Sequence, residues 1–120
     1  MDRVATFKSF IARTPDDPFP RYGLAMEHKS SGDLAEAWAC FADLMDKFPD
    51  YVATYLMAGG TLAAMGRGDE AAEVYRRGVA VAGRKGDSHA RGELETALAE
   101  LSTQSVSGGG VAVKPEPRIP

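Results

Sequence analysis

The chain has 120 residues, of which 44% are hydrophobic and 26% are charged, and its formal net charge is −3. This length accommodates one modest domain. Since an acidic chain lacks the positive field that collects phosphates, we expect no nucleic-acid partner. One cysteine, Cys40, excludes an internal disulfide framework and favours a reducing, cytoplasmic location.

The sequence also argues against secretion and membrane insertion. No apolar stretch of signal-peptide length follows Met1 before the charged Lys8 and Arg13. The longest uncharged stretch of the helical part, residues 51–66, is shorter than the roughly 20 residues that cross a bilayer. We therefore expect a cytoplasmic protein with no membrane partner.

Two helices are predicted in the first 30 residues. The first covers about residues 2–13, where four apolar residues recur at helical spacing. They are Val4, Phe7, Phe10 and Ile11. The second runs from Pro18 to about Ser30, because Asp17 precedes it as an N-cap and Gly32 follows it as a stop.

Two further helices are predicted between residues 33 and 66. Asp33 and Glu36 have the spacing of a capping box, which predicts the start of a third helix that ends near residues 48–49. Asp50 is expected to cap a fourth helix that continues to Met65 and stops at Gly66.

The last two helices are predicted between residues 68 and 101. The fifth runs from about residue 68 to Ala82 and is broken by Gly83 and Gly86. The sixth is capped by Asp87 and ends at Leu101. Its leucines recur at spacings of four and three residues, with glutamates between them. We therefore expect one face of this helix to lie against the domain and the other to face solvent.

A period of 34 residues runs through the chain. The aromatic residues Phe7, Phe41 and Tyr75 are separated by this interval. Four further pairs share it: Pro15 with Pro49, Asp16 with Asp50, Gly32 with Gly66, and Ala37 with Ala71. Such a period predicts stacked helical hairpins, which bury their apolar faces against one another and leave a concave surface.

These residues resemble the tetratricopeptide repeat family. One repeat's pattern is filled by Leu24, Ala25, Gly32, Ala37, Phe41 and Pro49, and the next by Tyr55, Gly59, Leu62, Gly66, Ala71 and Tyr75. The resemblance covers about residues 2–101. It implies an all-α fold, an α-α superhelix of antiparallel helical hairpins, with two full repeats, an N-terminal half repeat and a C-terminal capping helix. Arg21 departs from the pattern where an aromatic residue is common, and Gly83 replaces the final proline.

The resemblance implies that the first helix of each repeat lines a concave peptide-binding groove. The residues expected there are Phe19, Tyr22, Met26, Leu56, Gly60 and Ala63. They lack the Lys and Asn side chains with which part of the family grips chaperone tails. We therefore expect a protein-interaction scaffold or adaptor, of bacterial type, that binds an apolar peptide or helix.

An alternative stays open for the same apolar surface. The last helix or a second copy could cover it, and the chain would then be a self-assembling structural subunit that forms homo-oligomers.

No catalytic, metal-binding or cofactor site is predicted. His28 and His89 show no metal-ligand spacing with Cys40 or with carboxylates, and no nucleophile has a recognisable base. We expect a protein that is not an enzyme.

The composition changes at Ser102, so we divide the chain into a helical domain, residues 1–101, and a tail, residues 102–120. Glycine and serine in the first part of the tail indicate a flexible spacer. The second part combines apolar residues with prolines and is expected to be a docking segment. Its contact residues are Val111, Val113, Pro115, Pro117 and Ile119. The alternative is an idle tail.

Overall fold

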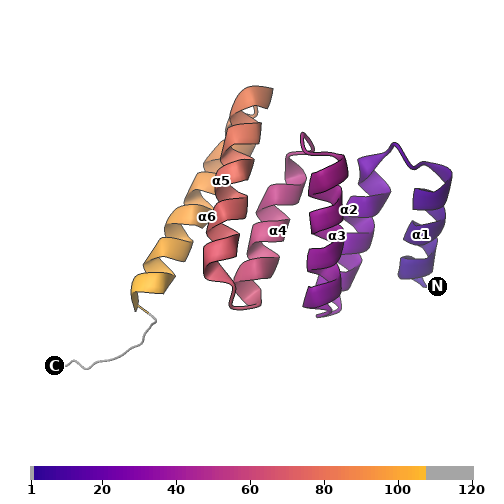
Figure 1. The fold of residues 1–120 in the computed structure, drawn as a ribbon, viewed down its shortest axis with the longest axis horizontal. Helices are drawn as coiled ribbons and strands as arrows, with labels where there is room; N and C mark the ends of the chain where they lie inside the picture. Colours follow the sequence, from indigo (N-terminus) through magenta and orange to yellow (C-terminus); the bar gives the residue numbers. More distant parts are fainter. Residues whose placement is uncertain (1, 108–120) are drawn as a thin grey trace.

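The computed structural model describes residues 2–107, which form six α-helices joined by short turns. The helices are α1 (Arg3–Arg13), α2 (Pro18–Ser30), α3 (Leu34–Lys47), α4 (Ala53–Ala64), α5 (Gly68–Lys85) and α6 (Ser88–Ser107). They stand side by side in chain order, with α1 at one end of the row and α5 and α6 at the other (Figure 1). The predicted all-α superhelix of helical hairpins is confirmed.

Several predicted helix boundaries are confirmed by hydrogen bonds. The side chain of Asp17 accepts from the backbone N–H of Phe19 at 3.0 Å, and that of Asp87 accepts from Ala90 at 3.0 Å. The turns after α2 and α4 contain Gly32 and Gly66 at φ of 81° and 77°, a conformation that costs glycine little.

Asp33 occupies the predicted N-cap position of α3, but neither Asp33 nor Asp50 makes the predicted side-chain capping hydrogen bond. The side chain of Asp33 makes no capping hydrogen bond and lies 3.9 Å from Nδ1 of His28. Asp50 pairs with the guanidinium of Arg84 at 3.1 Å, whereas α4 has Val52 at its N-cap position. Both helices therefore begin without the predicted side-chain capping hydrogen bond.

Helices α5 and α6 are longer than predicted. Gly83 lies inside α5, and the left-handed residue that ends this helix is Gly86 at φ 71°. Because glycine inside a helix costs only about 0.5–1 kcal/mol, Gly83 alone does not stop it. Helix α6 continues to Ser107, beyond the Leu101 at which the sequence places the end of the helical domain.

The core consists of aromatic side chains packed against small residues of neighbouring helices. Phe41 is fully buried in α3. Tyr75 in α5 lies so close to Gly59 in α4 that a Cβ added at Gly59 would meet its ring at 2.3 Å. Phe7 in α1 meets Gly23 in α2 in the same way, also at 2.3 Å. Small residues therefore allow the helices to approach closely, as the repeat pattern predicts.

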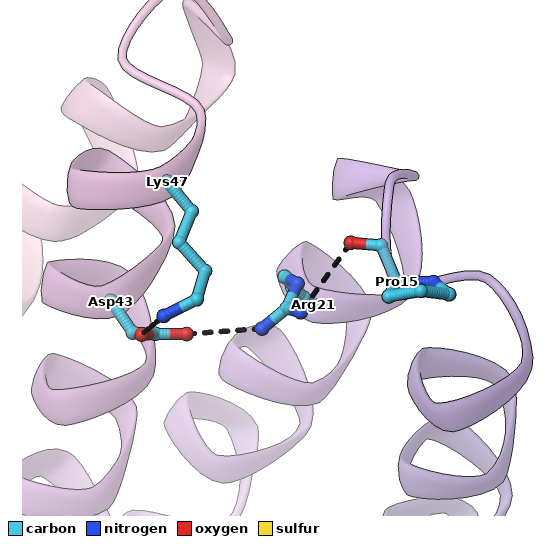
Figure 2. Close-up of polar contacts among 4 residues, drawn as sticks. All are labelled: Pro15, Arg21, Asp43 and Lys47. Atoms are coloured by element: carbon cyan, nitrogen blue, oxygen red, sulfur yellow. Dashed lines mark hydrogen bonds and ion pairs between the residues drawn. The ribbon is translucent and has the colours of Figure 1, made fainter.

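The departure at Arg21 is accommodated by polar contacts. Its guanidinium lies between the α1–α2 turn and α3, where it donates to the carbonyl oxygen of Pro15 at 3.5 Å and to Asp43 at 3.1 Å (Figure 2). Asp43 also accepts from Lys47, one turn along α3. In the next repeat, 34 residues on, the hydroxyl of Tyr55 donates to the carbonyl of Pro49 at 2.6 Å. Arginine thus supplies the donor that tyrosine supplies in the second repeat.

The two ends of the row are finished differently. Helix α6 buries Leu94 against the domain and presents glutamates outward. Helix α1 contains no fully buried residue, and 43% of Phe10 is exposed. The equivalent residue 34 positions later, Leu44, is fully buried. Helix α1 is therefore an open end of the stack, whereas α6 closes the other.

Candidate functional site

A groove of about 630 Å³ lies between α4 and α6. Helix α4 contributes Leu56, and the first four turns of α6 contribute the other lining residues. These are Ser88, His89, Gly92, Glu93, Thr96, Ala97 and Glu100. One side of the groove is therefore apolar, and the other is polar and acidic.

Helical spacing explains how α6 builds its side of the groove. Glu93, Thr96 and Glu100 follow one another at intervals of three and four residues, so they lie on one face of the helix. The adjoining leucine face of α6 is fixed to the domain, because Leu94 packs beside Gly78 of α5. Packing of the leucine face thus turns the carboxylates towards the groove.

The groove has a negative electrostatic character. Its lining includes Glu93 and Glu100 and contains no lysine or arginine. Nε2 of His89 lies 3.6 Å from a carboxylate oxygen of Glu93. Burial, and to a lesser extent the charge of Glu100, raises the pKa of the Tyr75 hydroxyl, so this phenol stays neutral. The groove therefore favours a cationic group beside an apolar one.

The residues that the sequence predicts for a groove occupy different environments. Leu56 lines the α4–α6 groove. Phe19, at the start of α2, is 62% exposed. The ring of Tyr22 makes edge contacts with Phe41 at 6.2 Å and with Tyr51 at 5.7 Å. Of these three predicted residues, one lines the groove, one is exposed at the start of α2, and one packs against other aromatic rings.

The other three predicted residues lie beside the core. Met26 and Ala63 are partly buried against the central hydrophobic cluster. Gly60 is partly exposed, and a Cβ added there would lie 3.9 Å from the hydroxyl of Tyr75. The acidic residues of α6 were not predicted as part of a groove, although the three–four spacing of Glu93, Thr96 and Glu100 is visible in the sequence.

The described residues contain no group of three or more His, Cys, Asp or Glu side chains that could hold a metal ion. Burial raises the pKa of the Cys40 thiol, with Asp43 and Glu36 adding to the effect and Lys8 opposing it. A raised pKa disfavours the reactive thiolate. Cys40 thus has the environment of a structural thiol.

None of the helices within residues 2–107 has the length and apolar character needed to span a membrane. The predicted tail contacts Val111, Val113, Pro115, Pro117 and Ile119 lie outside the described residues.

Comparison with solved structures identifies the family. A tetratricopeptide repeat domain protein from Salinibacter ruber is 35% identical, with a TM-score of 0.70. The match covers 74% of this chain and 99% of that one. This chain belongs to the tetratricopeptide repeat family. An NMR structure of the Salinibacter ruber domain gives 34% identity and a TM-score of 0.73 over 79% of this chain and 96% of that one.

More distant tetratricopeptide repeat structures share the fold. The TPR2B domain of yeast Sti1, solved in a pHsp70 complex, is 19% identical and has a TM-score of 0.79. That match covers 85% of this chain and 82% of the yeast domain. No protein-family model matches the sequence, and no curated protein is significantly similar to it.

Proposed function

We propose that this tetratricopeptide repeat protein is a bacterial, cytoplasmic adaptor that binds a segment of another protein in the α4–α6 groove. The observation that carries the proposal is the groove itself, which Leu56 and two glutamates line without a lysine or arginine beside them. A segment with an apolar residue next to Lys or Arg would satisfy both sides.

The fold supports a protein ligand rather than a small-molecule substrate. The yeast TPR2B domain was solved in a complex with pHsp70, so this arrangement of helices accepts a protein partner there. The lining residues here include neither Lys nor Asn, so the clamp that grips chaperone tails is not reproduced in the groove. A cationic, apolar segment fits better than a carboxylate end, and we assign no enzymatic role.

Capture of partners from a lysate of the source cells tests this proposal. Thr96→Arg places a bulky cation in the groove at an exposed position, so it should repel a basic ligand without disturbing the core. Ala80→Arg, at an exposed position of α5, is the matched control. Quantitative mass spectrometry should show partners that are lost with Thr96→Arg and retained with Ala80→Arg. Equal capture by both variants would place the binding surface elsewhere.

Self-assembly is a second candidate function, favoured by the open end at α1. Phe10 is 43% exposed on a helix that has no neighbour on one side, and exposed apolar surface of this kind often marks a contact. If copies associate there, Phe10→Glu should convert an oligomer into a monomer in light scattering. A wild-type monomer at micromolar concentration would remove this candidate.

A further inference from the structure

We infer that residues 111–120 of this same chain bind in the α4–α6 groove and act as an intramolecular competitor of the protein ligand. The inference rests on the proposed function, because it takes the groove to be the ligand surface. The occupant is identified by charge, by spacing and by the length of chain that follows α6.

The charges of the segment complement those of the groove. The side chains of residues 108–120 include two cations, Lys114 and Arg118, and one carboxylate, Glu116, so the side-chain charge of the segment is +1. The groove presents Glu93 and Glu100 without a lining lysine or arginine. Beside them, Leu56 offers an apolar contact for the valines and the isoleucine of the segment.

The spacing of the cations matches the spacing of the carboxylates. Glu93 and Glu100 are seven residues apart in a helix, which corresponds to about 10 Å along its axis. Lys114 and Arg118 are four residues apart in the run Lys-Pro-Glu-Pro-Arg. In the extended polyproline II conformation that such a run favours, four residues correspond to about 12 Å.

The direction and length of the chain allow this placement. A segment that returns from Ser107 meets Glu100 first and Glu93 second, which pairs Glu100 with Lys114 and Glu93 with Arg118. Lys114 is seven residues along the chain from Ser107, a separation that reaches up to about 23 Å when extended. The distance from Ser107 back to Glu100 along α6 is about 10 Å. Three glycines at 108–110 permit the reversal of direction.

Attachment to the same chain makes a weak contact sufficient. A short linker gives the segment an effective concentration of about 1 mM, so an intrinsic dissociation constant near 1 mM already leaves about half of the molecules occupied. A ligand from another protein must displace the segment, which lowers its apparent affinity by about twofold at that occupancy.

Paramagnetic relaxation in the full chain tests the inference. A nitroxide is attached to Pro120→Cys in a Cys40→Ala background, and the amide signals of Gly92 and Ser102 are compared. If the segment binds as inferred, the label lies near the first half of α6, and Gly92 loses more signal than Ser102. If the segment is free, the label is on average nearer the end of α6, and Ser102 loses more signal.

Charge variants separate binding from proximity. Lys114→Glu with Arg118→Glu, and separately Glu93→Gln with Glu100→Gln, should make Ser102 the more attenuated signal. Glu95→Gln is the matched control, because Glu95 lies on α6 outside the groove and pairs with Arg91 at 3.3 Å. Greater attenuation of Ser102 than of Gly92 in the unmodified segment would overturn the inference. This readout needs no partner protein, so its failure is distinguishable from failure of the capture experiment.

Discussion

The close contact between Gly59 and Tyr75 gives a quantitative test of the packing between α4 and α5. A Cβ at position 59 would meet three ring atoms of Tyr75, at 2.3, 2.6 and 2.8 Å. Overpacking of this kind costs roughly 1–3 kcal/mol. Replacing glycine by alanine inside a helix returns about 0.5–1 kcal/mol. Gly59→Ala should therefore lower the free energy of unfolding by roughly 0–2.5 kcal/mol, rather than raise it as an unobstructed substitution would.

The neighbouring glycine provides the control. Gly60 lies in the same helix, and a Cβ added there would come no closer than 3.9 Å to the Tyr75 hydroxyl, which is an ordinary contact. Gly60→Ala should thus raise the free energy of unfolding by up to about 1 kcal/mol, because only the helix propensity changes. Urea denaturation followed by circular dichroism measures both variants under identical conditions.

A double-mutant cycle shows whether Tyr75 causes the difference. Tyr75→Leu removes the ring atoms that the added Cβ would meet, so Gly59→Ala should cost much less in that background. If Gly59→Ala stabilises the wild-type chain as much as Gly60→Ala does, Tyr75 is not packed on α4 as described. The assignment of Tyr75 as the residue between the two helices would then be wrong.

Three further outcomes are expected. Phe41→Ala should cost roughly 3–5 kcal/mol in urea denaturation, since Phe41 is fully buried, and a loss below about 1 kcal/mol would contradict that burial. The double variant Arg21→Tyr with Asp43→Arg should lose at least about 0.5 kcal/mol less unfolding free energy than the two single variants lose in total. If the losses are additive, the two positions are not coupled. Burial is the largest cause that raises the pKa values of Tyr22, Tyr51, Tyr55 and Tyr75. The phenols of the unfolded chain begin to ionise at about pH 10. Below that pH the neutral phenols make their full contribution to the free energy of unfolding, and this contribution is lost as the pH rises through the pKa values of the folded state. Melting temperatures measured at increasing pH should therefore fall above about pH 10, and a constant melting temperature while the phenols ionise would contradict this.

The architecture could be predicted because the repeat imposes the same packing problem three times. Phe7, Phe41 and Tyr75 each need a neighbouring helix with a small residue, and the sequence supplies Gly23 and Gly59 for two of them. One pattern that recurs at a fixed interval specifies both the elements and how they stack. The fold therefore followed from spacing, without any knowledge of individual contacts.

Local capping signals were less reliable than the repeat. Asp17 and Asp87 cap their helices, whereas Asp33 and Asp50, which have similar sequence surroundings, do not. For Asp50 the structure shows a distant partner. Arg84, 34 residues from Asp50, pairs with its carboxylate, and such a contact cannot be read from the residues beside the helix start.

The groove could be predicted only in part. Leu56 is one of the residues that helical spacing assigned to a groove, and it lines the groove between α4 and α6, but the spacing could not show which helix would face it. The same spacing grouped Tyr22 with the groove, and it could not show that Tyr51, from the connection before α4, packs against the ring of Tyr22. A helical wheel gives the faces of a helix, and the rotation of that helix in the stack decides which face lines a groove. For α6 that rotation is set by Leu94.

The two full repeats have an ion pair and a cation–aromatic pair at equivalent positions of the repeat junction. In the second repeat, Tyr55 donates to the Pro49 carbonyl, and the guanidinium of Arg77 lies 5.8 Å from the centre of its ring. In the first repeat the equivalent positions hold Arg21 and Asp43, and they form an ion pair. The positive charge of the pair is on α5 in the second repeat and on α2 in the first. Because a donor to the proline carbonyl and an attractive contact to the second helix are kept in both cases, we expect the junction to tolerate the exchange when both positions change together.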